Sequence, residues 1–266
     1  MSGPVEEHDT LEDFEKRTLT FDDEAKSVYV AGSGPGVIVM SEVPGITPTV
    51  ARFARWVRNA GFTVWMPSLY GTDGAAATLE RAQGVFQSAC VAREFQAFAG
   101  GEASPMASWL RQLAAHAHDE CGGPGVGAIG MCFTGNFALT LTLEPSVLAP
   151  VMSQPALPLD NPAGTFISPD DMAAIKARLD TEDLTVLAYR FEGDSYCQAA
   201  RFDAFSGALG DRFVSKVLPD SDAGEYGWTG VPHSVVTTSL VDEAGHPTIQ
   251  VRDEILEFFT HRLQRT

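Results

Sequence analysis

Short apolar runs alternate with longer amphipathic segments along most of the sequence, and this alternation constrains the fold more than any other feature. Residues 37–40 and 147–152 have the length and composition of buried strands, whereas residues 48–60 carry apolar side chains at helical spacing. Strands and helices that alternate in this way are typical of a parallel sheet with helices on both faces. The sequence predicts strands at 37–40, 62–66, 126–129, 147–152, 184–191 and 212–218, and helices at 48–60, 83–98, 106–118, 136–143, 169–179, 198–208 and 247–262.

The start of the chain adds a hairpin and a tail to this plan. Residues 17–21 and 27–31 are typical of two short strands in an N-terminal β-hairpin. A length of 266 residues fits one domain, because α/β folds routinely reach about 250 residues around one sheet. We therefore expect a single domain over residues 15–266, preceded by an acidic tail over residues 1–14.

The charge of the chain limits its partners. The sequence holds 35 acidic and 18 basic side chains, a formal net charge of −17. A field of this sign repels phosphate backbones and anionic lipid headgroups, so we expect neither nucleic-acid nor membrane binding. The first residues are acidic where a secretory signal is basic and then apolar, which predicts a cytoplasmic protein. Its four cysteines are then expected to be reduced thiols.

The sharpest local signal is Gly130-x-Cys132-x-x-Gly135, which lies between a predicted strand and a predicted helix. Small residues on both sides of a nucleophile allow a tight strand-to-helix turn that leaves the central side chain exposed above the sheet. A cysteine at the start of a helix also meets free N–H groups and the positive end of the helix dipole, which favour a thiolate. Cys132 is therefore a candidate nucleophile, the alternative being a small buried side chain where a helix packs on a strand.

A nucleophile needs a base, and the base needs an orienting group. Asp194 lies in the loop after the predicted strand at 184–191, and His233 lies in a Gly- and Pro-rich loop after the last predicted strand. Taken alone, Asp194 is more often a turn or N-cap residue, and His233 an ordinary loop histidine. The chain order nucleophile, acid, histidine is, however, that of α/β-hydrolases. Together these residues predict a Cys-His-Asp triad.

Two further candidates follow the apolar run at 37–40. Glu42 is an unusual residue for the end of a buried strand unless something holds it there, and a solvated loop carboxylate is the alternative. Val43 lies in the loop that supplies one oxyanion-hole amide in α/β-hydrolases. The other amide comes from the residue after the nucleophile, here Phe133.

These residues resemble the dienelactone hydrolase (carboxymethylenebutenolidase) family of the α/β-hydrolase superfamily, over residues 15–262. The resemblance implies an α/β-hydrolase fold with a mostly parallel central sheet. One position departs from the pattern, because Thr134 stands where the family commonly has a second glycine. The matching segments are Ser41-Glu42-Val43-Pro44-Gly45, Pro67-Ser68-Leu69-Tyr70, Gly130-Met131-Cys132, Gly193-Asp194 and Pro232-His233-Ser234.

The resemblance implies a role for each of these side chains. Cys132 is the expected nucleophile, His233 the base and Asp194 the group that orients it. Glu42 is expected to contact the resting thiol and to help deprotonate it when substrate arrives. The implied reaction is attack of the thiolate on a lactone or ester carbonyl, formation of a thioester, and its hydrolysis by water. No metal or organic cofactor is expected, and the expected partner is a small ester or lactone bound by a monomer or small homo-oligomer.

The substrate-binding part of the family pattern is incomplete. Family members that act on dienelactone have an arginine four residues after the histidine to bind the substrate's carboxylate, and here that residue is Thr237. A second carboxylate-binding arginine is expected before the turn at residues 130–135, here called the elbow, where Arg81 and Arg93 are available. Tyr70 and Trp228 are candidates for the pocket wall, with core packing as the alternative. A short-chain carboxylesterase that acts on neutral esters is therefore the alternative to a dienelactone hydrolase.

Other functional classes have weaker support. Residues 125–130 match the G-x-G-x-x-G dinucleotide fingerprint, but the glycines fall within a predicted strand rather than after it, which disfavours a nicotinamide-dependent oxidoreductase. His116 and His118 lie two residues apart on a predicted helix, so they point away from each other and are poor metal ligands. A non-catalytic binding protein with this fold has no need of a complete triad.

Overall fold

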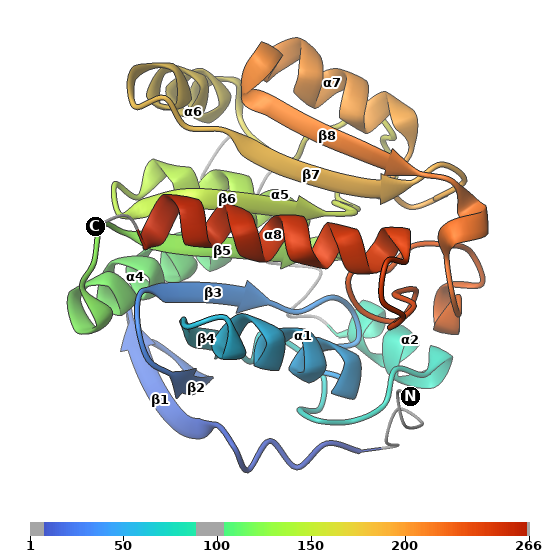
Figure 1. Cartoon of the computed structure of the whole chain (residues 1–266), viewed down its shortest axis with the longest axis horizontal. Helices are drawn as coiled ribbons and strands as arrows, with labels where there is room; N and C mark the ends of the chain where they lie inside the picture. The colour runs from blue at the N-terminus through green and yellow to red at the C-terminus, as the bar shows by residue number, and fades with distance from the viewer. Residues whose placement is uncertain (1–7, 89–103, 265–266) are drawn as a thin grey trace.

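Eight strands form one sheet within residues 8–88 and 104–264, the residues that this computed structural model describes (Figure 1). Their order is β1-β2-β4-β3-β5-β6-β7-β8; β1 pairs antiparallel with β2 and β2 with β4, and all other pairs are parallel. β4 lies on one side of β3, whereas β5 and the strands after it lie on the other side, so the strand order changes direction between β3 and β5. In sheets of this kind, ligands bind beyond the carboxyl ends of the strands at such a point. The strands are β1 (Glu15–Phe21), β2 (Glu24–Gly32), β3 (Gly36–Met40), β4 (Thr63–Pro67), β5 (Val126–Met131), β6 (Val147–Ser153), β7 (Val186–Phe191) and β8 (Phe213–Leu218).

Helices cover both faces of the sheet (Figure 1). α1 and α8 pack against Val37 and Val39 of β3, whereas α4 to α7 pack on the opposite face with Ile38 and Met40. Every residue of β3 is buried, as expected for a strand covered on both sides. Among the described helices, none combines the length and apolar content needed to cross a bilayer. The helices are α1 (Pro48–Asn59), α2 (Leu79–Gln87), α4 (Pro105–Cys121), α5 (Gly135–Thr140), α6 (Pro169–Thr181), α7 (Ala199–Leu209) and α8 (Pro247–Leu263).

The predicted α/β architecture with an N-terminal hairpin is confirmed, with different element ends. The hairpin strands are longer than predicted, because most of their added residues are charged and all are exposed or only partly buried, so they lack an apolar pattern. Helix α2 begins at Leu79 instead of residue 83, since Thr78 caps it by accepting a hydrogen bond from the N–H of Arg81 at 3.3 Å. Residues 89–98 of that predicted helix lie outside the described residues.

The glycines around β5 allow close packing. A Cβ atom at Gly127 would lie 2.9 Å from Cδ1 of Phe259 in α8, and one at Gly125 would lie 2.4 Å from the carbonyl oxygen of Ser146. Neither position has space for a side chain. Packing therefore accounts for the fingerprint-like pattern, and its glycines lie in and beside the strand rather than in a phosphate-binding turn.

Residues 8–14, here called the N-terminal strap, lie against α1. Phe14 is buried among the side chains of the α1 and α8 face. Arg55 of α1 donates hydrogen bonds to the carboxylates of Asp9 and Asp13, with shortest distances of 2.6 and 2.7 Å. Acidic side chains of the strap are thus paired with basic side chains of the helix.

Candidate active site

The turn after β5 holds Cys132 in left-handed backbone. Its φ is +56°, a conformation that is costly for a residue other than glycine. A Cβ atom at Gly130 would lie 2.0 Å from the carbonyl oxygen of Thr134, and one at Gly135 would lie 2.6 Å from Cα of Pro155. The turn therefore requires glycine at both positions, which explains the spacing of the motif.

The Thr134 hydroxyl group supports this turn. It accepts a hydrogen bond from the N–H of Met131 at 2.8 Å, and the carbonyl oxygens of Met40 and Ser41 each lie 3.1 Å from it as acceptors. These contacts join the elbow to the end of β3. Threonine at this position therefore makes bonds that the family's usual glycine cannot make.

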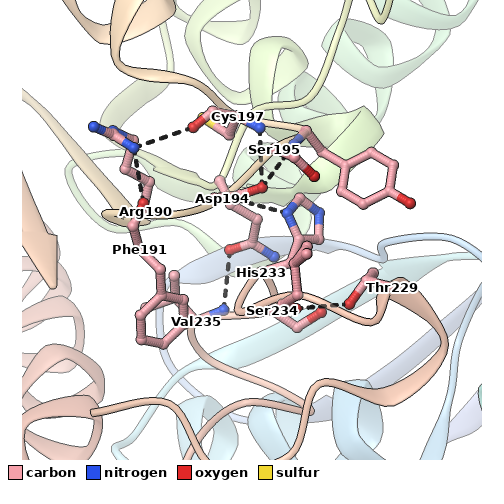
Figure 2. Close-up of polar contacts among 12 residues, drawn as sticks. Arg190, Phe191, Asp194, Ser195, Cys197, Thr229, His233, Ser234 and Val235 are labelled. Atoms are coloured by element: carbon pink, nitrogen blue, oxygen red, sulfur yellow. Dashed lines mark hydrogen bonds and ion pairs between the residues drawn. The ribbon is translucent and has the colours of Figure 1, made fainter. Parts of the chain in front are cut away.

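Asp194 and His233 form a buried pair (Figure 2). Asp194 follows β7, and its Oδ1 accepts hydrogen bonds from the backbone N–H groups of Tyr196 and Cys197 at 2.9 and 3.0 Å. Its Oδ2 lies 2.7 Å from Nδ1 of His233. Residues 194–197 form a turn, and at its end Arg190 donates to the carbonyl oxygen of Cys197 at 3.4 Å. Because Asp194 occupies Nδ1, the imidazole has Nε2 available for proton transfer.

The charge state of His233 depends on its neighbours. Burial by itself would lower its pKa, because burial disfavours the imidazolium form. The negative charges of Cys132 and Asp194, together with the hydrogen bond to Asp194, outweigh burial and raise the pKa of His233 well above its usual range. These surroundings therefore favour the imidazolium form of His233.

Glu42 is buried at the same edge of the sheet, 4% exposed. It accepts hydrogen bonds from Ser234 Oγ at 2.8 Å, from Gln154 Nε2 at 3.1 Å, and from Thr237 Oγ1. Within the described residues these neutral groups are its hydrogen-bonding partners, and the expected contact with the cysteine thiol is not among them. Burial raises the pKa of Glu42, and the three hydrogen bonds oppose that shift.

Thr237, the position expected to be arginine in enzymes that bind a carboxylate, does not face a substrate site. Its side chain is fully buried, and its hydroxyl group donates to Glu42. Gln154 and Ser234 were not predicted to bind Glu42 either. Gln154 directly follows β6, so the rule that sites lie at the carboxyl ends of strands was the signal available for finding it.

The two expected oxyanion-hole residues lie beside Cys132. Val43 and Phe133 are buried with Cys132 in one apolar cluster, and Trp228 packs against this cluster. The indole Nε1 of Trp228 donates to the carbonyl oxygen of Val43 at 3.2 Å, which joins the Trp228 loop to the loop after β3. The structure thus brings Val43, Phe133 and Trp228 to the elbow.

The remaining predicted pocket residues lie at different distances from the site. Tyr70 packs against the apolar cluster that contains Cys132, and its hydroxyl group donates to the carbonyl oxygen of Ser41 at 2.6 Å. Burial and the charges of Cys132 and Glu42 raise the pKa of Tyr70. Arg81 is exposed and lines, with Tyr70, a surface cavity of about 480 Å³ whose lining does not include Cys132. Arg93 lies outside the described residues.

An aromatic rim surrounds the elbow. The ring of Phe86 lies 5.3 Å from that of Phe133 and 5.9 Å from that of Trp228, measured between centroids. The Tyr196 ring continues the rim, 6.1 Å from Trp228 and 5.2 Å from the His233 ring. Phe86 was missed because a single ring on an amphipathic helix carries no pattern that separates a pocket wall from ordinary packing.

The histidine pair in α4 makes separate contacts. His116 packs against the rings of Phe21 and Trp65, and His118 Nε2 lies 3.2 Å from the carbonyl oxygen of Gly123. Over residues 8–88 and 104–264, no three His, Cys, Asp or Glu side chains gather as metal ligands do.

Known structures share this architecture. A putative dienelactone hydrolase from Klebsiella pneumoniae subsp. pneumoniae MGH 78578 is 15% identical, with a TM-score of 0.63 over 92% of this chain and 98% of that chain. A dienelactone hydrolase-like promiscuous phosphotriesterase from metagenomic libraries is 20% identical, with a TM-score of 0.60 over 94% and 98%. A cold-adapted esterase from an Arctic intertidal metagenomic library is 14% identical, with a TM-score of 0.55 over 93% and 92%. At these identities the likeness shows the fold, which is that of the α/β-hydrolases.

Sequence comparison goes further than the fold. A search of curated proteins gives no match. The model of the dienelactone hydrolase family, however, matches residues 25–179, a span that includes the Glu42 loop and the cysteine elbow. Because this match spans more than half of the chain, the chain belongs to the dienelactone hydrolase family.

Proposed function

We propose that this hydrolase cleaves a lactone or carboxylic ester through Cys132, His233 and Asp194, with a thioester on Cys132 as the covalent intermediate. The observation that carries the proposal is the buried 2.7 Å contact between Asp194 Oδ2 and His233 Nδ1, next to a cysteine in strained backbone. An orienting acid, an imidazole with Nε2 available and a thiol at a strand-to-helix turn are the parts of a nucleophilic acyl-transfer site.

The reaction divides into two acyl transfers. Sγ of Cys132 attacks the carbonyl carbon, and the carbonyl π electrons move to oxygen, where the N–H groups of Val43 and Phe133 are the proposed donors. Collapse of this intermediate breaks the ester C–O bond, and the leaving alkoxide takes the proton from Nε2 of His233. Water then adds to the thioester as His233 accepts one of its protons, and the carboxylic acid leaves as the thiolate is restored.

Glu42 is the proposed proton acceptor for the thiol when substrate arrives, and it returns this proton to the thiolate after the carboxylic acid has left. Burial raises its pKa, so that the protonated form is easier to reach than for an exposed glutamate. Its hydrogen bonds to Ser234 and Thr237 hold the carboxylate at the end of β3 before that transfer.

The substrate we favour is a neutral ester rather than an anionic lactone. Thr237 is buried against Glu42, so it offers no charge to a substrate carboxylate. The apolar part of the site is formed by the side chains of Val43, Phe133, Ala156 and Leu157, which pack with Cys132. An anionic group placed there would lose its hydration without gaining a counter-charge from them, whereas an uncharged acyl group would not.

Turnover of p-nitrophenyl acetate by matched cysteine variants tests the mechanism. Cys132→Ala is expected to lower kcat/KM by about 10³-fold or more, because the covalent route is removed. Cys121→Ala is the control, since this thiol lies at the C-terminal end of α4, where it accepts a hydrogen bond from Trp65. This variant is expected to leave the rate within about twofold of wild type. Acid quenching of the wild-type reaction should yield an acetyl group on the Cys132 peptide. Unchanged turnover in Cys132→Ala would rule out the proposed nucleophile.

A further inference from the structure

Arg201 is a buried arginine whose hydrogen bonds all go to the main chain. It lies in the first turn of α7 and is 1% exposed. A guanidinium group has five N–H donors, and each of these meets a carbonyl oxygen. The acceptors are Gly164 at 2.8 Å from Nε, Pro155 and Tyr196 at 3.1 and 2.9 Å from Nη1, and Pro158 and Asn161 at 2.5 and 2.9 Å from Nη2.

Two separate segments supply these carbonyl groups. Four belong to residues 155–164, here called the wall loop, which follows β6 and turns every third carbonyl, those of 155, 158, 161 and 164, towards the guanidinium. The fifth belongs to Tyr196, in residues 194–197, here called the acid turn. One cation thereby joins the wall loop to the acid turn.

The stability of α7 does not explain this arginine. A cation in the first turn of a helix meets the positive end of the helix dipole, which is unfavourable. Burial lowers the pKa of the Arg201 guanidinium, and the neighbouring charges of Cys197, Asp194 and Cys132 oppose that shift. A buried charge is retained at such a position only where its hydrogen bonds offset the loss of water.

Both segments border the proposed nucleophile. The N–H of Ala156 in the wall loop donates to the carbonyl oxygen of Cys132 at 2.9 Å, and Ala156 and Leu157 pack in the same apolar cluster as Cys132. The acid turn supplies the two N–H groups that hold Asp194. The distance between these segments therefore sets both the width of the site beside Cys132 and the position of the carboxylate that orients His233.

We propose that Arg201 is a positioning residue, which holds the wall loop against the acid turn so that the space beside Cys132 keeps one width and admits small acyl groups better than bulky ones. Its guanidinium touches no reacting atom. It acts through main-chain carbonyl groups on both sides of the site. The effect of Arg201 on ester turnover rests on the proposed function, whereas its effect on the width of the space beside Cys132 does not.

Selective alkylation of Cys132 tests the geometry directly. The rate at which iodoacetamide alkylates Cys132 is compared with the rate for the bulkier N-benzyliodoacetamide, and both rates are measured by mass spectrometry of the peptide that contains Cys132. Arg201→Lys keeps the positive charge but has one nitrogen in place of three, so it cannot hold five separated carbonyl groups. We expect this variant to lower the small-to-bulky rate ratio at least fivefold, because the wall loop moves away from the acid turn.

A matched arginine separates this effect from general loss of stability. Arg178 in α6 also donates to main-chain carbonyl oxygens, those of Glu144 and Pro145 at 2.6 and 2.7 Å, but on segments that do not border Cys132. Arg178→Lys is therefore expected to leave the alkylation ratio within twofold of wild type. A change of equal size in both variants, or in neither, would overturn the proposal.

A second variant decides the question if Arg201→Lys fails to fold. Asn136 of α5 also anchors the wall loop and the residue that follows it, with Nδ2 donating to the carbonyl oxygens of Leu157 and Thr165 at 3.1 and 2.6 Å. Asn136→Ala is expected to lower the alkylation ratio in the same direction, and an unchanged ratio would count against the proposal.

Ester turnover gives the catalytic readout. In Arg201→Lys, kcat/KM for p-nitrophenyl hexanoate relative to acetate is expected to rise as discrimination is lost, while kcat for both falls because Asp194 is held less firmly. Absence of Cys132-dependent turnover in wild type would overturn the proposed function only, since the alkylation ratio still decides the role of Arg201.

Discussion

Cys132 combines a strained backbone with a buried and well-connected turn. A non-glycine residue at φ +56° costs on the order of 1–3 kcal/mol. The Thr134 hydroxyl group offsets part of this cost, because it joins the backbone of Met131 to the end of β3. The elbow is therefore stabilised by its tertiary contacts rather than by local preference.

Replacement of Thr134 by valine tests this support. Valine has nearly the same shape but cannot accept the hydrogen bond from Met131, so the variant is expected to lose about 1–3 kcal/mol of unfolding free energy in urea. Thr134→Ser keeps the hydroxyl group and is the control. Equal losses in the two variants would show that packing of the methyl group, rather than the hydrogen bonds, stabilises the turn.

Sequence reasoning reached some site residues and missed others for a physical reason. Cys132, Asp194 and His233 each follow a strand and have side chains suited to one reaction, so position and chemistry single them out together. Thr237 and Arg201 lack such a signal, because a buried threonine or arginine takes its role from neighbours distant in sequence. Their contacts with Glu42 and the wall loop appear only after folding.

At the scale of elements, strand ends were predicted closely where an apolar run marks them and less closely in the polar N-terminal hairpin. All residues of β3 and β5 are buried, so their apolar runs mark their limits closely. In β1, exposed and partly buried residues alternate, and its polar start at Glu15 gives no apolar signal. Pairing with β2 defines that end of the strand.

The N-terminal strap is an element whose attachment depends on charge. Arg55 is the largest cause of the lowered pKa of Asp9 and of Asp13, by hydrogen bonding to each carboxylate. A carboxyl group with a lowered folded-state pKa contributes stability that is present above its unfolded pKa, near 3.8, and is lost as the pH falls through the folded value. Strap attachment should therefore weaken only in strong acid.

Arg55→Ala is expected to release this strap. The pairs are partly exposed, so the loss in unfolding free energy at pH 7 should be about 1 kcal/mol, and it should shrink as the pH falls below about 4. Limited proteolysis within residues 8–14 should accelerate. Arg212→Ala, which removes pairs with Asp180 and Asp183 instead, should leave strap cleavage unchanged. Equal cleavage in the two variants would contradict the assignment.

For the whole molecule, the net charge of −17 acts on any charged substrate. An anionic ester approaches against this field, whereas a neutral one does not. Added salt shortens the range of the field, from about 30 Å at 0.01 M to about 10 Å at 0.1 M ionic strength.

A matched pair of substrates measures this effect. Between 0.01 and 0.1 M salt, kcat/KM for p-nitrophenyl hemisuccinate should rise by about two- to fivefold, while that for p-nitrophenyl butyrate stays within about twofold. At every salt concentration the neutral ester is expected to be the better substrate. A faster reaction with hemisuccinate would show that an anion-binding group serves the site, and would overturn the preference for neutral esters.

The carboxylate of Glu42 links the end of β3 to Gln154 after β6 and to Ser234 and Thr237 in the histidine loop. Loops that share one buried acid cannot diverge independently, because a change in any of them alters the hydrogen bonds of the others. New substrate ranges in this lineage should therefore arise through compensated sets of substitutions. A directed-evolution library that varies the three loops together should yield more active variants than libraries that vary each loop alone.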